Sequence, residues 1–489
     1  MPIHKPEKMK RFCLLLLLYM LCPYALRAEE RTLVIYSTND MHGTITPYDK
    51  IVRFMEEERT KHPNALLLSG GDMFSGNPVV DQYPQRGMPI IALMNLAGYQ
   101  YAVPGNHEFD YGQKALEACR EQAEFELLCA NMQVDKDKAL LSQPQPYALI
   151  ERDGIRIAIL GLTETSHRRK DGSLIPGANP MGMEGIHFED PIETALKYRF
   201  LRQECDVFIA LTHLGTDDDK KLAEAMPELD LIVGGHSHTR ISRTLLTNGV
   251  LIAQAEEKLN YINKVTLTLD GKTITGRKTE LIKVEKLGKA DPTATSLIQK
   301  FHQEMPLNKP LAEVHAQFDG TQPLGMLMAD ALNSFCGTDF AFQNSGGVRI
   351  KELPKGAITL GDVYRMDPFK NQIVTLEMTP DEIRVLLMNS HQKGSQKADL
   401  LPAGMKYTLH THDGEAIGVT MTDMQGKPLD ENKRYKVSMN GYIAASYRFD
   451  ESIPRQEMET TTDIALIKYL GQMGKITPQR RSRAIVMEE

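Results

Sequence analysis

The sequence has few cysteines, no surplus of basic residues and no apolar run of membrane-spanning length. Its 489 residues include six Cys, none in a Cys-x-x-Cys spacing, so it lacks the pattern of a zinc ribbon or a thioredoxin-like site. Lys and Arg total 57 against 64 Asp and Glu, which gives a formal net charge of −7. Proteins that bind the phosphate backbone use a basic surplus, so we expect no nucleic acid polymer as a partner.

The N-terminal residues have the pattern of a leader peptide. Basic residues precede an apolar core from Phe12 to Leu21, and small residues follow up to Ala28. This order predicts a cleavable signal peptide over residues 1–28, and hence a periplasmic or secreted protein. A membrane anchor needs roughly 20 apolar residues, about twice the length of this core, so we expect no stable membrane span after cleavage.

Four cysteines remain once the leader is removed. An oxidising compartment permits disulfides without requiring them, and isolated cysteines commonly serve as small buried apolar side chains. We therefore expect buried thiols. Cys119 and Cys129 form the one pair close enough along the chain for a local disulfide.

The mature chain divides into two α/β units. From residue 31 to about 285, β-type apolar runs alternate with amphipathic helical stretches, which predicts a layered α/β domain. The stretch from Asp291 to Met305 has helical spacing and ends before Pro306, so we expect a linker helix there. The predicted segments are a signal peptide at 1–28, a catalytic domain at 29–287, a linker helix at 288–315 and a C-terminal substrate-binding α/β domain at 316–489.

Five segments of the first domain share one construction, in which an apolar run ends in a turn carrying Asp, Asn or His beside Gly. In open α/β sheets such turns converge outside the carboxyl ends of the strands. Imidazole nitrogens combined with carboxylate and amide oxygens suit Zn, Mn, Fe or Co better than calcium. Each pattern alone is common by chance, but five together predict a metal centre. The segments are TNDMHG (38–43), SGGDMFSG (69–76), PGNHEFD (104–110), LTHLG (211–215) and GGHSHT (234–239).

These turns offer too many ligands for one metal. Two metals about 3.5–4 Å apart need a shared carboxylate, and Asp72, alone in its Gly-rich turn, is the natural bridge. We therefore expect two divalent ions, Zn, Mn or similar. The candidate ligands are Asp40, His42, Asp72, Asn106, His213, His236 and His238.

The ordered series TNDMHG, GGD, GNHEFD, THLG and GGHSHT resembles the calcineurin-like metallophosphatases. GNHEFD together with NSGGVR (344–349) resembles their bacterial 5′-nucleotidase/UDP-sugar hydrolase branch, over nearly the whole mature chain. The resemblance implies a four-layer α/β/β/α metal domain, a linking helix and a C-terminal substrate domain that can rotate. It also implies a first metal held by Asp40, His42, Asp72 and His238, a second held by Asp72, Asn106, His213 and His236, and a catalytic dyad of His107 and Asp110.

The expected chemistry follows from charge. Two cations lower the pKa of a bound water, supply hydroxide at neutral pH and neutralise charge on the phosphoryl oxygens. Asp110, three residues after His107, is placed to orient the imidazole and favour its charged form. His107 can then stabilise a phosphoryl oxygen or protonate the leaving group, and no covalent protein nucleophile is needed.

Two residues of NSGGVR are predicted to bind substrate. Arg349 follows a Gly turn, and its guanidinium has the right shape to bind phosphate in bidentate fashion. The resemblance implies that this Arg contacts substrate, while an ordinary surface ion pair is the alternative. Asn344 is the weaker candidate, because Asn before a turn is also common turn chemistry.

The nucleobase clamp of the resembled family, a pair of aromatic rings, is altered in this chain. Leu400 stands where the first ring is expected, and NGYIAASYRFD (440–450) lacks the GGDG turn that carries the second. Tyr442, Tyr447 or Phe449 could supply a ring, and we predict Tyr447 and Phe449 as substrate-binding residues. Loss of one ring weakens nucleotide preference without affecting the chemistry, since stacking contributes about 1–3 kcal/mol per base.

The sequence therefore predicts an exported dinuclear-metal phosphohydrolase that acts as a 5′-nucleotidase on nucleoside 5′-monophosphates or related nucleotides. One alternative keeps the catalytic domain and changes the substrate, to 2′,3′-cyclic nucleotides or to UDP-sugars and nucleotide diphosphates. A second alternative is a nucleotide-binding surface protein without turnover. The apparent completeness of the ligand set, with His107 beside it, favours the enzyme.

Overall fold

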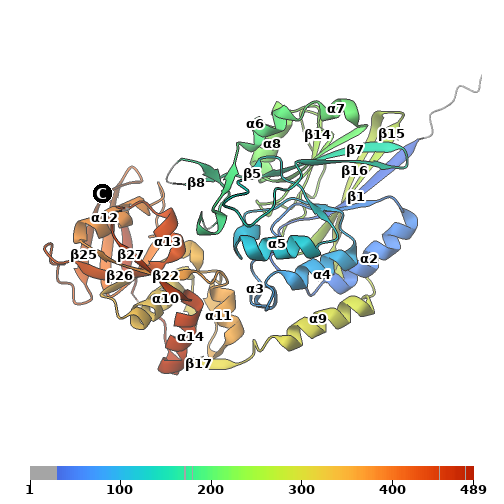
Figure 1. Cartoon of the computed structure of the whole chain (residues 1–489). Helices are drawn as coiled ribbons and strands as arrows, with labels where there is room; N and C mark the ends of the chain where they lie inside the picture. The colour runs from blue at the N-terminus through green and yellow to red at the C-terminus, as the bar shows by residue number, and fades with distance from the viewer. Residues whose placement is uncertain (1–29, 170–171, 179, 451, 480) are drawn as a thin grey trace, which may run out of the picture.

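The structure, a computed structural model, describes residues 30–169, 172–178, 180–450, 452–479 and 481–489 (Figure 1). The predicted signal peptide at 1–28 lies outside these residues. No helix in the described ranges is long and apolar enough to cross a membrane.

The first half of the chain contains two six-stranded sheets. The first sheet has the order β16 (Thr273–Lys283), β15 (Tyr261–Asp270), β1 (Arg31–Thr38), β2 (Leu66–Ser69), β3 (Tyr101–Ala102) and β4 (Glu126–Leu127). The second has the order β13 (Leu245–Thr247), β14 (Val250–Ala253), β12 (Leu231–Val233), β11 (Val207–His213), β7 (Ile155–Thr163) and β6 (Tyr147–Arg152).

The core strands are buried on both faces. On β1, Leu33 and Ile35 lie in the core between the two sheets, whereas Val34 and Tyr36 pack beneath helices, as the two-residue period of a strand requires. Helices α2 (Tyr48–Lys61), α4 (Met88–Ala97) and α5 (Gln113–Gln122) cover the first sheet, and α6 (Pro191–Lys197), α7 (Leu201–Glu204) and α8 (Thr216–Ala225) cover the second (Figure 1). This order of layers confirms the predicted α/β/β/α sandwich.

Helix α9 (Pro292–Glu304) packs along the outside of the first half. It begins at Asp291, whose side chain accepts a hydrogen bond from the Ala294 amide at 2.7 Å. Ile298 and Phe301 pack into the core formed with α2 and α4. The chain leaves this helix toward the second half of the molecule (Figure 1).

The second half is built on a mixed five-stranded sheet covered on both faces, which is the predicted C-terminal α/β unit. The sheet has the order β23 (Leu400–Ala403), β19 (Phe340–Asn344), β26 (Tyr435–Asn440), β22 (Gln372–Met378) and β27 (Arg455–Thr461). Helices α10 (Thr321–Cys336) and α14 (Thr462–Met473) pack on one face. The other face carries α12 (Pro380–Asn389) and a small sheet of β25 (Glu415–Asp423), β24 (Met405–His412) and β29 (Ala484–Glu488).

Shorter elements connect these layers. In the first half they are α3 (Pro78–Asp81), β5 (Met132–Val134), β8 (His167–Arg168), β9 (Leu174–Ile175) and β10 (Ile186–Phe188). In the second half they are β17 (Pro310–Val314), β18 (Phe318–Asp319), β20 (Glu352–Leu353), β21 (Gly356–Thr359), α11 (Leu360–Met366), α13 (Gly441–Ser446) and β28 (Lys475–Ile476). The 3-10 turns are η1 (His107–Phe109), η2 (Pro180–Met183), η3 (Val284–Lys286) and η4 (Ser345–Gly347).

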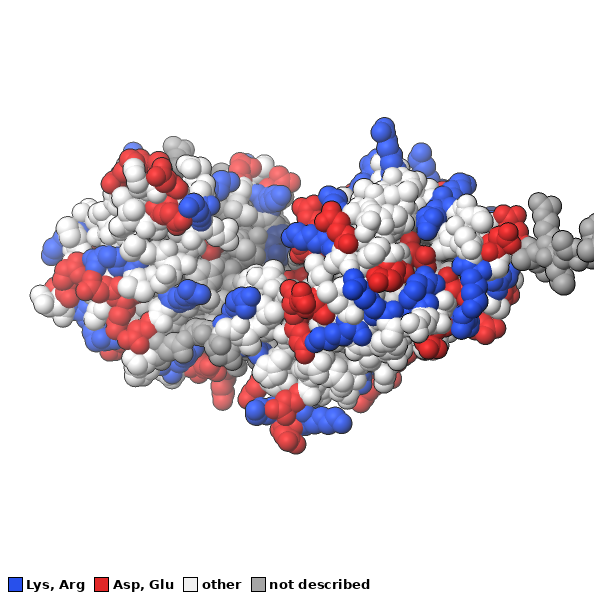
Figure 2. All heavy atoms as spheres, turned by 90° about the horizontal axis from the view of Figure 1, so that it is seen from above, with Lys and Arg blue, Asp and Glu red and all other residues white. Residues whose placement is uncertain are grey.

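The two halves touch through a few short elements. Helix α11 contacts α3, and α13 contacts η2. Arg86 donates a hydrogen bond across the boundary to the Pro368 carbonyl oxygen at 3.1 Å. The described cysteines are free thiols, and Cys119 and Cys129 are buried, so the local disulfide does not form. Acidic and basic side chains intermingle over the face seen from above (Figure 2), as the balanced composition leads one to expect.

Candidate metal centre

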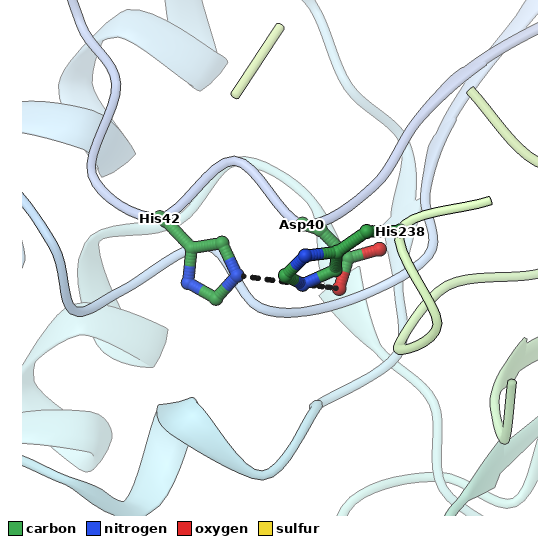
Figure 3. Close-up of side chains that lie close together, drawn as sticks. All are labelled: Asp40, His42 and His238. Atoms are coloured by element: carbon green, nitrogen blue, oxygen red, sulfur yellow. Dashed lines mark hydrogen bonds and ion pairs between the residues drawn. The ribbon is translucent and has the colours of Figure 1, made fainter. Parts of the chain in front are cut away.

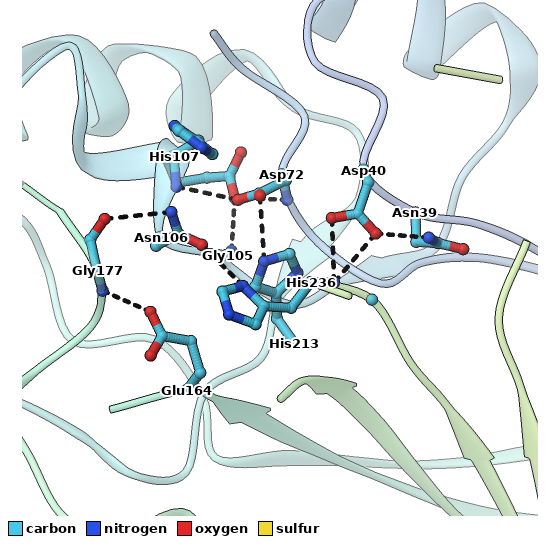
Figure 4. A network of polar contacts seen from close by, with 12 residues as sticks. Asn39, Asp40, Asp72, Gly105, Asn106, His107, Glu164, Gly177, His213 and His236 are labelled. Carbon is cyan, nitrogen blue, oxygen red and sulfur yellow. Dashed lines mark hydrogen bonds and ion pairs between the residues drawn. The ribbon is translucent and has the colours of Figure 1, made fainter. Parts of the chain in front are cut away.

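The polar turns predicted from the sequence meet at one edge of the sandwich. Strands β1, β2 and β3 are parallel to one another, as are β7, β11 and β12, so their carboxyl ends point the same way within each sheet. All seven predicted ligands follow or end these strands. The structure brings them into two adjoining clusters (Figures 3 and 4).

The backbone at this edge is strained. A positive φ is uncommon outside glycine, and such conformations concentrate at functional sites. Five of the seven predicted ligands adopt it. They are Asp40 (φ 50°), His42 (φ 47°), Asp72 (φ 52°), His236 (φ 76°) and His238 (φ 52°).

Glycine in the same turns lets the strands approach one another closely. A Cβ atom on Gly105 would lie 2.2 Å from Asp72 Oδ1, and one on Gly235 would lie 2.3 Å from the Gly70 carbonyl oxygen. Neither distance leaves room for a side chain, so these positions require glycine for reasons of space.

The first cluster contains Asp40, His42 and His238 (Figure 3). The Nε2 atoms of His42 and His238 are 3.1 Å apart, and His238 Nε2 is 3.4 Å from Asp40 Oδ1. The Nδ1 atoms of both rings face acceptors, the Ser75 carbonyl oxygen at 3.1 Å and Glu257 Oε2 at 3.3 Å. Protons held at Nδ1 leave both Nε2 lone pairs directed at one point, which is the arrangement that a metal ion requires.

The second cluster contains Asp72, Asn106, His213 and His236 (Figure 4). His213 donates from Nδ1 to the Gly70 carbonyl oxygen at 2.7 Å, and its Nε2 lies 3.2 Å from Asp72 Oδ2. His236 Nδ1 lies 3.1 Å from Asn106 Oδ1. His213 Nε2 is fully buried and has no hydrogen-bond partner among the described residues, so a cation fits between it and the carboxylate.

Asp72 borders both clusters. Its Oδ2 lies 3.9 Å from His42 Nε2 and 3.2 Å from His213 Nε2, while its Oδ1 accepts a hydrogen bond from the His107 amide at 2.9 Å. Burial raises the pKa of this carboxyl, but the surrounding histidines outweigh burial and hold the pKa well below its usual range. The side chain is therefore an anion placed between two groups of nitrogen ligands.

Glu108 supports the turn that carries Asp72. Its Oε2 accepts from the Asp72 amide at 2.9 Å, and its Oε1 accepts from the Met73 and Phe74 amides at 2.7 and 3.2 Å. Burial and the neighbouring Asp72 raise the pKa of Glu108 to about 7. Both carboxyl oxygens of Glu108 therefore accept hydrogen bonds from backbone amides.

A chain of hydrogen bonds orients Asn106. The Asn106 side-chain Nδ2 donates to the Gly177 carbonyl oxygen at 3.3 Å, and the Gly177 backbone amide donates to the buried Glu164 carboxylate (Figure 4). This contact turns Asn106 Oδ1 toward His236. Sequence reasoning missed Glu164, because the segment after β7 lacks the Gly turn that marks the five predicted segments.

His107 and Asp110 form a close pair beside the first cluster. His107 Nδ1 lies 2.6 Å from Asp110 Oδ2, and only 14% of the His107 side chain is exposed. Burial lowers the pKa of His107, but Asp110 and Asp72 outweigh burial and raise the pKa to about 9. With Nδ1 held by Asp110, the Nε2 atom is the one available to a substrate.

A cleft of about 270 Å³ joins this pair to the second half of the chain. Its first wall comes from Asn106, His107, Asp110, Gly177 and Ala178, and its second from Asn344, Gly346, Gly347, Arg349, Phe369, Asn371 and Tyr442. The Arg349 guanidinium lies 5.6 Å from the centre of the Phe369 ring. No carboxylate of the described residues forms an ion pair with Arg349, which differs from the surface ion pair considered as the alternative from the sequence.

The predicted aromatic residues divide between the cleft and the core. Tyr442 lines the cleft, whereas Tyr447 and Phe449 are not among its described lining residues and pack against the domain core. The Tyr447 hydroxyl donates to Asp399, and Leu400 is fully buried in β23. Phe369, for which the sequence predicts no role, supplies a second ring at the cleft.

The two halves of the chain match two different families of known proteins. The chain matches the calcineurin-like phosphoesterase family over residues 33–240 and the 5′-nucleotidase C-terminal domain over residues 305–448. It is 29% identical over 484 residues to protein UshA of Yersinia enterocolitica, covering 84% of this chain and 85% of that protein. It is 26% identical over 474 residues to the trifunctional nucleotide phosphoesterase YfkN of Bacillus subtilis, covering 84% of this chain.

The chain spans about a third of the length of YfkN, of which it covers 32%. Among solved structures, the 5′-nucleotidase precursor of Thermus thermophilus is similar at a TM-score of 0.75 and 26% identity, covering 94% of this chain and 100% of that one. The two matched regions follow one another along the chain, and one lies in each half of the fold. The chain therefore belongs to the calcineurin-like phosphoesterases that carry a 5′-nucleotidase C-terminal domain, a family of metal-dependent phosphoric ester hydrolases.

Proposed function

We propose that this chain is an exported 5′-nucleotidase, which hydrolyses nucleoside 5′-monophosphates or related nucleotides with two divalent ions. The observation that carries the proposal is one cleft that has Asn106, a member of the second cluster, and His107 on its first wall and Arg349 on its second. Export rests on the leader pattern at residues 1–28.

The donor sets support two ions that share Asp72. Asp40, His42 and His238 would hold the first with Asp72, and the second would take Asn106, His213 and His236 with Asp72. Nitrogen and oxygen donors in these numbers suit Zn or Mn. Ions bound there supply Lewis acidity that activates water and neutralises charge on the phosphoryl oxygens.

The chain's own groups bind and orient the ester. Arg349 and His107 approach the cleft from opposite walls, so a phosphoryl group between them meets a positive charge on each side. Asp110 fixes the His107 ring and keeps Nε2 protonated, so His107 can hold a phosphoryl oxygen or pass its proton to the leaving oxygen. Tyr442 and Phe369 supply aromatic side chains in the cleft for contact with a nucleoside.

The experiment is phosphate release by the purified mature chain, stripped of metal and reloaded with Mn or Zn, from 5′-AMP and 3′-AMP. Metal-dependent release from 5′-AMP alone is the expected result. The relative named as a trifunctional nucleotide phosphoesterase makes other substrates worth including, so 2′,3′-cyclic AMP and UDP-glucose are assayed in parallel.

Each result has a distinct meaning. Faster turnover of the cyclic diester or of the nucleotide sugar would replace the 5′-nucleotidase assignment and keep the hydrolase. Tight nucleotide binding without any release, from a protein with both metals bound, would support a binding protein instead.

A further inference from the structure

We propose that Ser75 is a positioning residue for the His107–Asp110 pair, a role that no sequence motif assigns to it. Ser75 lies in the turn after β2, three residues beyond Asp72, and is 3% exposed. This inference rests on the proposed function for its effect on turnover, but its geometry can be tested without any substrate.

The Ser75 hydroxyl contacts the same carboxylate oxygen as the His107 ring. Ser75 Oγ donates to Asp110 Oδ2 at 2.6 Å, and His107 Nδ1 lies 2.6 Å from that oxygen. Two donors that converge on one oxygen fix both the torsion of the carboxylate and its distance from the ring. Without the hydroxyl, the carboxylate can rotate, and the imidazole loses its fixed direction toward the cleft.

The backbone of Ser75 holds that hydroxyl in place. Its amide donates to Tyr111 Oη at 2.9 Å, the Tyr111 hydroxyl donates to the buried Asp81, and the Ser75 carbonyl faces His42 Nδ1 at 3.1 Å. The residue also has φ at 62°, in the left-handed region. Every polar group of Ser75 therefore has a partner, and one residue connects the first metal cluster to the dyad.

Ser69 is a nearby buried serine with a different pattern of contacts. Ser69, at the end of the same strand, is also fully buried, but its hydroxyl has no hydrogen-bond partner among the described residues. The two serines flank the same turn and are both buried, but the described contacts with the dyad come from Ser75. Ser69→Ala is therefore the matched control for Ser75→Ala.

The first experiment uses the full mature protein without metal or substrate. In a ¹⁵N-histidine-labelled sample, the Nδ1–H resonance of His107 is assigned by its absence from His107→Ala. We expect this resonance to survive in Ser69→Ala and to shift and exchange-broaden in Ser75→Ala. An unchanged resonance in Ser75→Ala would overturn the proposal. If Ser75→Ala does not fold, Ser75→Gly removes the hydroxyl and accepts the positive φ.

The second experiment measures phosphate release with metals bound. Loss of a hydrogen bond to a charged group predicts a kcat about 10- to 100-fold lower in Ser75→Ala, with KM within twofold and both metals retained. In a His107→Ala background, adding Ser75→Ala should change kcat no further, because Ser75 acts through the dyad. An equal loss in both backgrounds would place its effect elsewhere. If the wild type hydrolyses no phosphate ester, the proposed function fails while the spectrum still decides the role of Ser75.

Discussion

Asp72 is the residue that we propose as the ligand shared by the two metal ions. Its carboxylate lies between His42 of the first cluster and His213 of the second. We expect Asp72→Asn, which keeps the volume and removes the charge, to bind fewer than two metals per chain and to lose at least 100-fold in kcat. Metal content after dialysis, measured by mass spectrometry, tests this. Two tightly held ions in the variant would contradict the shared-ligand assignment.

His107 has the geometry of either a catalytic group or a ligand. It lies close enough to His42 and Asp72 to join a metal cluster, yet its Nδ1 is held by Asp110. We expect His107→Ala to lower kcat about 10²- to 10⁴-fold, the range typical of a lost general acid, and to keep its metals. Loss of an ion from the variant would make His107 a ligand instead.

Asp367 gives the stability of the second half a pH dependence. Burial and the neighbouring Asp463 raise the pKa of Asp367 to about 7, although Thr462 donates to it at 2.6 Å. The folded chain thus keeps a proton that the unfolded chain releases near pH 4. Stability from this group is present at low pH and declines as the pH rises from about 4 to 7.

Asp367→Asn removes that titration while keeping the shape of the side chain. We expect the variant to match the wild type near pH 4.5 and to be more stable at pH 8, by at most about 4 kcal/mol for a pKa raised by roughly three. Melting temperatures of both proteins across this pH range provide the measurement. Equal melting temperatures at pH 8 would show that the buried carboxyl costs nothing when ionised.

At the scale of elements, the turns after the strands leave no space for a side chain at their closely packed glycines. Gly105 packs so closely against Asp72 that a methyl group there would displace the carboxylate. We expect Gly105→Ala to weaken metal binding at least tenfold, as measured by calorimetric titration. Gly418→Ala in β25 is the control, because a methyl group at that position would meet no heavy atom of the described residues within 4 Å. Equal affinities in the two variants would show that the turn can relax.

The turns were predictable from the sequence because their chemistry is local. An apolar run followed by Gly and a polar residue specifies a strand end, and parallel strands bring such ends together. Glu164, Ser75 and Phe369 could not be found this way. Glu164 contacts the site through Gly177, Ser75 contacts Asp110, and Phe369 lies beside Arg349. These contacts depend on how separate segments pack rather than on which residues are adjacent in the sequence.

At the scale of the whole molecule, the cleft needs both halves of the chain. Arg349 comes from the second half and His107 from the first. We expect Arg349→Ala to raise KM about 10- to 100-fold and leave metal content unchanged, with Arg349→Lys intermediate because it keeps the charge and loses the bidentate geometry. Steady-state kinetics test the order of the three proteins. A KM equal to that of the wild type in Arg349→Ala would remove Arg349 from the binding site.

The domain pattern of the fold could be predicted, but the aromatic wall of the cleft could not. The alternation of strands and helices predicted the α/β layers, and the resemblance to the metallophosphatases implied the four-layer sandwich. Tyr442 faces the cleft while Tyr447 turns to Asp399, although both belong to one short segment. Which of the two rings faces the cleft depends on where α13 ends and on how α13 packs against the first half. The order of residues alone does not specify either.

The ligand clusters have a mechanical consequence. Asp40, Asp72 and Asn106 follow strands of the first sheet, and His213, His236 and His238 end or follow strands of the second. Ions held by both groups would cross-link the two sheets, so separating the sheets would require release of metal. Resistance to heat and to proteases would then rise with the free metal concentration, as for any ligand that binds only the folded state. If the chain is exported as proposed, it would persist longest where metal is plentiful.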